Sequence, residues 1–213
     1  MSGIADILQT WWPVLLAYFV GATPFGFLAG KSRGIDIRDH GSGNIGATNV
    51  LRTLGKPIGI TVLILDVLKG MLPVLIAIWA DKNSLVQIAT AIGAILGHNY
   101  TFWLGFKGGK GIATTAGALL PIMPIAILSA IAAWIISLKI TRYVSVASIV
   151  AAITIPVALA IRGLISGAWD LPVFCLGLFV CVLAIWKHRA NIGRLRRGEE
   201  NRFEKRTSKT SQD

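Results

Sequence analysis

The sequence is poor in cysteine, in acidic residues and in charge of either sign. Its 213 residues include two cysteines and ten Asp or Glu, and only 15% are charged, against about 25% in soluble domains. So few cysteines exclude a disulfide scaffold. Because 54% of the residues are hydrophobic and the mean hydropathy is +0.67, the composition also excludes a disordered chain and a secreted soluble enzyme. It indicates that lipid surrounds most of the chain.

Apolar stretches of roughly membrane-spanning length recur along the chain. A spanning helix needs about 20 mostly apolar residues. The candidates are residues 7–30, 57–80, 84–106, 111–138, 143–161 and 171–186. The first is not a cleaved signal peptide, because no basic segment precedes it and Asp6 stands there instead.

Basic residues in the connectors predict the orientation. The net charge is +11, and Lys and Arg gather in residues 31–56, 107–110, 139–142 and from 187 onward. The positive-inside rule places all four in the cytoplasm. A single crossing by residues 111–138 would contradict this, but Pro121 and Pro124 break a helix. We therefore expect two short segments, 111–120 and 125–138, that enter the membrane and return.

These observations predict the architecture. We expect an all-α integral membrane protein with about seven transmembrane helical segments, one pair of them short and broken by proline. Its N-terminus would lie outside and its C-terminus in the cytoplasm. Residues 1–200 would form one polytopic membrane domain with three cytoplasmic motif loops, and residues 201–213 a basic polar tail.

The first motif loop is rich in glycine. Its glycines match the dinucleotide-binding string G-x-G-x-x-G, but a membrane helix precedes them instead of a strand, so we reject that interpretation. Closely spaced glycines can still direct backbone N–H groups at an anion, as can a helix that begins near Thr48. An ordinary glycine-rich turn is the alternative. The residues of this motif are Gly41, Ser42, Gly43, Asn44, Gly46, Thr48, Asn49 and Arg52.

The second and third motifs are also basic. Lys107, Gly108, Gly109, Lys110 and Gly111 do not fit the P-loop spacing, but they precede a helix and can form an oxyanion cradle. A flexible positive flank is the alternative. In the third motif His188 and Asn191 are three apart and share a helix face. The arginines that follow would contact anionic lipid headgroups.

Polar residues inside the spans converge on the same face. Asp66 and Lys69 are three apart, so we expect them to pair inside the bundle. The pair His98-Asn99 and the residues Arg142 and Ser145 lie near the cytoplasmic loops. The sequence therefore predicts a cationic pocket at one end of an apolar bundle, able to hold two anionic groups and a lipid chain.

No metal and no cofactor is expected, because no Cys, His or carboxylate cluster has ligand spacing. Cys175 and Cys181 do not share a helix face. The pocket favours an enzyme that joins a phosphorylated polar molecule to an acyl donor. A membrane transporter of phosphorylated metabolites is the alternative, but transporters usually contain related halves, and no internal repeat is visible.

The three motifs resemble those of the bacterial acyl-phosphate:glycerol-3-phosphate acyltransferases, the PlsY family. The resemblance covers nearly the whole chain, including Asp66-x-x-Lys69 and Arg142-x-x-Ser145. It implies transfer of a fatty acyl group from acyl phosphate to the sn-1 hydroxyl of glycerol 3-phosphate. The products would be lysophosphatidic acid and phosphate, in the first step of phospholipid synthesis. It also implies a multi-pass protein of the bacterial inner membrane that acts as a monomer, with its site facing the cytoplasm and without nucleic acid.

The resemblance also implies the site residues. The expected catalytic residues are Ser42, Lys107, Lys110, His188 and Asn191. The expected substrate-binding residues are Gly41, Gly43, Asn44, Gly46, Thr48, Asn49, Arg52, Asp66, Lys69, His98, Asn99, Gly108, Gly109, Gly111, Arg142 and Ser145. Ser42, Arg52, Lys110 and Ser145 would hold the acyl phosphate, and Lys107, His188 and Asn191 the glycerol 3-phosphate.

The general base stays open at this point. His188 is one candidate, and the phosphate of the acceptor is the other. No histidine is followed five residues later by an aspartate. We therefore do not expect a histidine–aspartate pair that acts on a thioester donor.

Overall fold

The computed structural model describes residues 2–203, which form helices and no strands. Residues 204–213 of the expected basic tail lie outside the described part. The helices are α1 (Ser2–Gly21), α2 (Phe25–Lys31), α3 (Ala47–Leu54), α4 (Lys56–Trp79), α5 (Ser84–Asn99), α6 (Ile112–Leu119), α7 (Pro124–Thr141), α8 (Val144–Ser166), α9 (Leu171–Lys187) and α10 (Arg189–Arg196). Two short 3₁₀ helices, η1 (Ile37–Asp39) and η2 (Phe102–Leu104), lie in the loops.

Long apolar helices agree with the predicted membrane protein. Among residues 2–203, four segments are long and apolar enough to cross a bilayer: Gly3–Lys31, which joins α1 and α2, and the helices α4, α7 and α8. A fifth forms if α9 and α10, bent by 53° at their junction, count as one span. Helix α5 has 16 residues and α6 only 8, so these two are shorter.

The proline-containing stretch is broken where the sequence predicted. Helix α6 ends at Leu119 and α7 begins at Pro124, whose missing N–H costs nothing in a first turn. The expectation of two short segments is right for α6. It is wrong for α7, whose 18 residues extend about 27 Å at 1.5 Å per residue. Proline at a helix start fixes where the helix begins but does not limit how far it runs.

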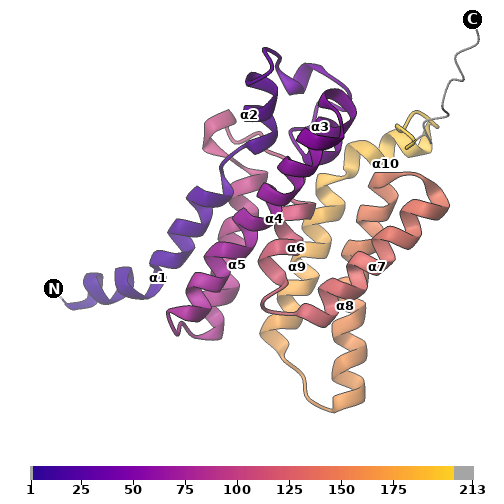
Figure 1. Ribbon diagram of the computed structural model, residues 1–213. Coiled ribbons are helices and arrows are strands. Elements are labelled where there is room, and N and C mark those ends of the chain that lie inside the picture. The colour runs from indigo at the N-terminus through magenta and orange to yellow at the C-terminus, as the bar shows by residue number, and fades with distance from the viewer. Residues whose placement is uncertain (1, 204–213) are drawn as a thin grey trace, which may run out of the picture.

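The helices form two groups. Helices α1, α4, α5 and α6 pack together on one side, and α7, α8 and α9 on the other (Figure 1). Within the first group α4 and α6 approach closely, because a Cβ on Gly70 or Gly117 would overlap the backbone of the facing helix. Small residues allow such close backbone contacts in membrane bundles.

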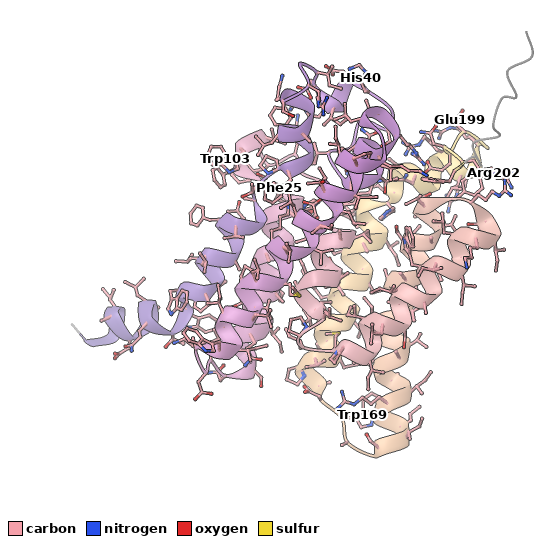
Figure 2. All side chains as sticks on the ribbon, in the orientation of Figure 1. Phe25, His40, Trp103, Trp169, Glu199 and Arg202 are labelled. Carbon is pink, nitrogen blue, oxygen red and sulfur yellow. The ribbon has the colours of Figure 1, made fainter. Side chains whose placement is uncertain are left out.

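The loops of the three motifs meet at one end of the bundle. Figure 2 shows His40 of the first loop at the same end as Glu199 and Arg202 of the C-terminal segment, and Trp169 at the opposite end. Helix α3 lies over this end and packs on α4. A small buried cluster of Ile37, Ile45, Val50 and Val62 fixes the first loop on the bundle.

Candidate active site

A cavity of about 410 Å³ lies between the two helix groups and reaches the end where the motif loops meet. Such a volume is typical of a small-molecule site. Its polar end is lined by the first loop, α3, α10 and the start of α6. The rest of its wall is mostly apolar and belongs to α4, α6, α7, α8 and α9, with Asp66 of α4 and His98 of α5 as polar members.

Most of the predicted site residues line this cavity. They are Ser42, Asn44, Gly46, Thr48, Asn49, Arg52, Asp66, His98, Lys110, Gly111, Ser145, His188 and Asn191. The other predicted residues do not line it: Gly41, Gly43, Lys69, Asn99, Lys107, Gly108, Gly109 and Arg142. Lys107 is exposed to solvent, so its side chain lies apart from the groups that the cavity brings together.

The first loop differs from the predicted anion cradle. Asn49 is buried and organises the loop, because its Oδ1 accepts the Ser42 N–H at 2.8 Å and its Nδ2 donates to the carbonyl oxygens of Ile37 and His40. The Gly46 N–H donates to Asn44 Oδ1 at 2.8 Å. These donors are therefore used inside the loop, while Ala47 and Thr48, at the start of α3, lie at the cavity.

Glycines of the second loop serve close packing. The N–H groups of Gly108 and Gly109 donate to the carbonyl oxygens of Asn99 and His98 at 3.2 and 3.1 Å. A Cβ on Gly109 would overlap the His98 ring, and Gly111 has a φ of +81° beside the Asn99 side chain. Because these glycines have no side chain, the loop packs closely against the end of α5, and this packing places Lys110 at the cavity.

The buried charges of α4 pair as predicted. Lys69 Nζ lies 2.8 Å from Asp66 Oδ1 and donates to the carbonyl oxygen of Thr23 at 2.8 Å. His98 Nδ1 is 3.8 Å from the same carboxylate oxygen, which is too long for a hydrogen bond. Asp66 and His98 reach the cavity wall while Lys69 lies behind it. This cluster supports the wall from inside the bundle.

His188 occupies the junction of α9 and α10 and is buried. Its Nδ1 lies 2.7 Å from the carbonyl oxygen of Ala184, which can only accept, so Nδ1 carries a proton. In the neutral ring Nε2 is then the acceptor. Although the junction is bent, His188 and Asn191 both line the cavity, as their spacing predicted.

Lys110 and Asn191 join the second and third motifs. Lys110 Nζ donates to Asn191 Oδ1 at 2.6 Å. Burial, together with nearby cations, lowers the pKa of Lys110 to about 8, while the carboxylate of Glu200 opposes this shift. A lysine with such a pKa binds an anionic group at neutral pH and loses its charge in mild alkali.

Glu200 is the functional candidate that the sequence analysis missed. Its side chain is 7% exposed, lines the cavity and contacts Asn191 and Arg194. Burial raises the pKa of this carboxyl, but polar contacts from Asn191, Ser145 and Arg194 outweigh burial and hold the pKa below its usual range. The signal in the sequence was an acidic pair, Glu199-Glu200, inside a basic segment.

Ser145 and the apolar wall complete the cavity. Ser145 Oγ is buried and makes no hydrogen bond of ordinary length among residues 2–203, but it lies near Glu200 and helps to lower the pKa of that carboxyl. Along α8, Ser148, Ala152 and Ile155 line the cavity beside the α7 residues, and Trp134 Nε1 of α7 donates to Ser148 Oγ at 3.2 Å. The hydroxyl lies at the cavity beside Glu200, and the small side chains of Ser148 and Ala152 leave room for an apolar chain.

The fold and the cavity define an integral membrane protein whose site combines a cationic end with a long apolar wall. A sequence profile described as glycerol-3-phosphate acyltransferase matches residues 11–198. Among curated relatives, a glycerol-3-phosphate acyltransferase of Desulforudis audaxviator is 46% identical over 95% of this chain and 98% of its own length. That of Geobacter sulfurreducens is 47% identical over 88% of this chain and 94% of its own. The chain belongs to the glycerol-3-phosphate acyltransferase family.

Solved structures agree with this assignment. The fold matches a crystal structure of PlsY, described as an integral membrane glycerol 3-phosphate acyltransferase, in its glycerol 3-phosphate form, with a TM-score of 0.85 and 40% identity. That alignment covers 91% of this chain and 94% of the other. The lysophosphatidic acid form of the same protein matches with a TM-score of 0.82. Membership of the PlsY-type family, predicted from the three motifs, is confirmed.

Proposed function

We propose that the protein transfers a fatty acyl group from acyl phosphate to the sn-1 hydroxyl of glycerol 3-phosphate and releases lysophosphatidic acid and phosphate. The observation that carries this proposal is one cavity with a cationic end and an apolar wall. The crystallised forms of the matched PlsY, one with glycerol 3-phosphate and one with lysophosphatidic acid, support the same acceptor and product. Enzymes of this class begin phospholipid synthesis.

The donor would lie along the wall of α7 and α8. Its phosphate would bind Ser42, Arg52 and Lys110 at the polar end, with the hydroxyl of Ser145 as a further donor. Its acyl chain would follow the small residues of α8. Leu63 of α4 and Ile131 of α7 line the cavity and are 46% and 40% exposed, which supports entry of the chain from the lipid between these helices.

The acceptor would bind at His188 and Asn191. Its sn-1 hydroxyl oxygen attacks the acyl carbon, the new C–O ester bond forms, and the bond from the acyl carbon to the phosphate oxygen breaks with its electron pair on the leaving phosphate. Positioning of both substrates and stabilisation of the oxyanion supply most of the acceleration. Lys107, exposed outside the cavity, would act through its charge on approaching anions.

The hydroxyl proton has two possible acceptors. Nε2 of His188 is the acceptor nitrogen of the neutral ring, since Nδ1 donates to Ala184. The phosphate of the acceptor itself is the other. We favour His188, because it is the one of the two that the protein holds in a fixed orientation.

We propose an N-terminus outside, a cytoplasmic C-terminus and seven membrane-embedded segments in the bacterial inner membrane. The basic loops support this orientation through the positive-inside rule. Exposed tryptophans also lie at two levels. Figure 2 shows Trp169 at one end and Trp103 toward the end with the motif loops, while Trp79 ends α4 and Trp186 lies in the last turn of α9. Such belts mark the two membrane interfaces. A monomer suffices in this proposal, because one chain provides the whole cavity.

The purified protein tests this function directly. It would be incubated with glycerol 3-phosphate and, in turn, acyl phosphate, acyl-CoA or acyl carrier protein thioester. We expect lysophosphatidic acid from acyl phosphate alone. Absence of product with every donor, combined with uptake of glycerol 3-phosphate into proteoliposomes, would instead support a transporter.

A further inference from the structure

A carboxylate lies inside the cationic end of the cavity. Glu200 Oε1 accepts a hydrogen bond from Asn191 Nδ2 at 2.6 Å, and Oε2 accepts one from Arg194 Nε at 2.8 Å. The side chain is 7% exposed. The sequence-profile match ends at residue 198, and none of the three motifs described above includes this residue. A buried carboxylate at the place where substrate phosphates would bind requires an explanation.

Glu200 fixes the orientation of the Asn191 amide. Lys110 Nζ donates to Asn191 Oδ1 at 2.6 Å, while Asn191 Nδ2 donates to Glu200. An ammonium can only donate and a carboxylate can only accept, so a flipped amide would face both with the wrong group. The carboxylate therefore holds Asn191, and Asn191 in turn holds the Lys110 ammonium at the cavity.

The segment that follows keeps the carboxylate in place. The carbonyl oxygen of Asn201 accepts from Arg52 Nη2 at 3.3 Å, and the Phe203 N–H donates to the carbonyl oxygen of Arg142 at 2.8 Å. Arg52 belongs to α3 and Arg142 to the turn between α7 and α8. The residues after Glu200 are thus attached to both sides of the cavity mouth, which fixes the position of Glu200 relative to each helix group.

Glu200 is also the counterion of this end of the cavity. The titratable groups that act on Lys110 or that Lys110 acts on are Arg52, Lys187, His188, Arg194 and Glu200. Among these Glu200 is the acid. Burial and the cations lower the pKa of Lys110, and Glu200 raises it. Removal of the carboxylate would therefore discharge Lys110 at a lower pH as well as release Asn191.

We propose that Glu200 is a positioning residue of the acyltransferase, which orients Asn191 and, through Asn191, directs Lys110 at the substrate phosphate. This inference rests on the proposed function. It assigns no contact between Glu200 and the reacting atoms. In this proposal Glu200 stays in place when substrates bind and does not block the phosphate site. Loss of its carboxylate would therefore impair the reaction and would not improve phosphate binding.

Glu200→Gln tests the proposal, with Glu199→Gln as its matched control. Glu199 is the neighbouring carboxylate, but it is exposed and paired with Arg197 at 2.7 Å, so its loss should change kcat by less than about twofold. For Glu200→Gln we expect kcat to fall about 10- to 100-fold, the effect of a small displacement in a reacting site. We also expect the alkaline limb of kcat/KM to move to lower pH.

Glu200→Asp separates positioning from general stability. It keeps the charge but shortens the side chain, so the alkaline limb should return toward that of the wild type while kcat stays low. A folding role alone would lower activity in proportion to the loss of folded protein and leave the limb unmoved, and that result would overturn the proposal. An unchanged kcat, or a lower KM for glycerol 3-phosphate in Glu200→Gln, would overturn it as well.

A readout that needs no turnover keeps this test apart from the proposed function. The rate at which an amine-specific reagent modifies Lys110, followed against pH by peptide mass spectrometry, reports its titration directly. Glu200→Gln, or Glu200→Asp if the first variant does not fold, should be compared with the wild type. The proposal predicts that Lys110 titrates at a lower pH in Glu200→Gln than in the wild type, and at an unchanged pH in Glu200→Asp, which keeps the charge. An unchanged titration of Lys110 in Glu200→Gln would contradict the proposal. Absence of acyl transfer by the wild type would contradict the proposed function alone.

Discussion

Lys110 would carry the charge on which anion binding at the cavity depends. It is the lysine of the second motif that reaches the cavity, whereas Lys107 stays outside. Its ammonium is fixed by Asn191 at 2.6 Å, and burial holds its pKa at about 8. The site is therefore sensitive to pH in a range where an ordinary exposed lysine is not.

The first prediction concerns the alkaline limb of activity. Because the folded-state pKa of Lys110 is lowered to about 8, its cation is present below this pH and is lost as pH rises through it. We expect kcat/KM for acyl phosphate to fall above about pH 8, and the fall to disappear in Lys110→Arg, since arginine stays protonated. Lys139→Arg, at an exposed lysine of α7, is the control. Identical limbs in Lys110→Arg and wild type would contradict the assignment.

The second prediction concerns the base. His188 Nδ1 donates to Ala184, so Nε2 can accept the proton of the acceptor hydroxyl. We expect His188→Ala to lower kcat at saturating substrates by about 10²–10⁴-fold, the usual contribution of a general base. Near-normal turnover with a raised KM would exclude a histidine base and leave the acceptor phosphate in that role.

Residue roles were only partly predictable from the sequence. The residue types and their spacing indicated which segments meet, and Lys110, His188 and Asn191 do line one cavity. Spacing could not tell whether a glycine N–H faces a ligand or another residue. Gly108 and Gly109 donate to the end of α5, a contact between segments that no local pattern contains. Glu200 was missed for the same reason.

At the scale of elements, the second loop is built on the end of α5. The third prediction tests this contact. Gly109→Ala would place a Cβ against the His98 ring, and such overpacking typically costs about 1–3 kcal/mol. We expect lower thermal stability and a large loss of activity. Gly193→Ala in α10, where the nearest atom lies 3.5 Å away, should be tolerated. Equal stability of the two variants would show that close packing is not the reason for the glycine.

The buried ion pair of α4 is the subject of the fourth prediction. Removing one partner leaves an uncompensated buried charge, which costs about 3–5 kcal/mol. Asp66→Leu and Lys69→Met should each lower the free energy of unfolding strongly, and the double variant should be more stable than the sum of the singles implies. Denaturant unfolding in detergent measures this. Additive losses would contradict a direct interaction between the two side chains.

Helix boundaries followed from the sequence where a local signal sets them. Pro124 starts α7, and the side chains of Asn83 and Asp170 accept the N–H groups of Val86 and Val173 at the starts of α5 and α9. The length of α7 and the bend between α9 and α10 were not predicted. These depend on packing against neighbouring helices, which apolar content alone does not determine.

At the scale of the whole molecule, the site lies between two helix groups, so each substrate can approach by its own route. The cationic end of the cavity opens where the motif loops meet, and the apolar wall runs down α7 and α8. Leu63 and Ile131 lie both at the cavity and at the exposed surface. The water-soluble acceptor would thus enter from the aqueous side and the lipid donor from the bilayer, so the acceptor need not enter lipid and the donor need not enter water.

The fifth prediction concerns the acyl wall. Ala152 is buried in α8 and lines the cavity, so Ala152→Phe would fill part of the space for the acyl chain. We expect the KM for a long-chain acyl phosphate to rise at least tenfold more than that for a short-chain one, a discrimination typical of apolar pockets. Val150→Phe, on the exposed side of the same helix, should change neither. A uniform loss with all chain lengths would contradict the wall assignment.

The central claim is that the cavity joins an acyl phosphate to glycerol 3-phosphate by attack at the acyl carbon. It is tested most directly by giving the purified protein palmitoyl phosphate with a radioactive phosphorus and unlabelled glycerol 3-phosphate. The account predicts lysophosphatidic acid and inorganic phosphate in equal amounts, with all of the label in the inorganic phosphate. Label in the lysophosphatidic acid, or no lysophosphatidic acid at all, would contradict it.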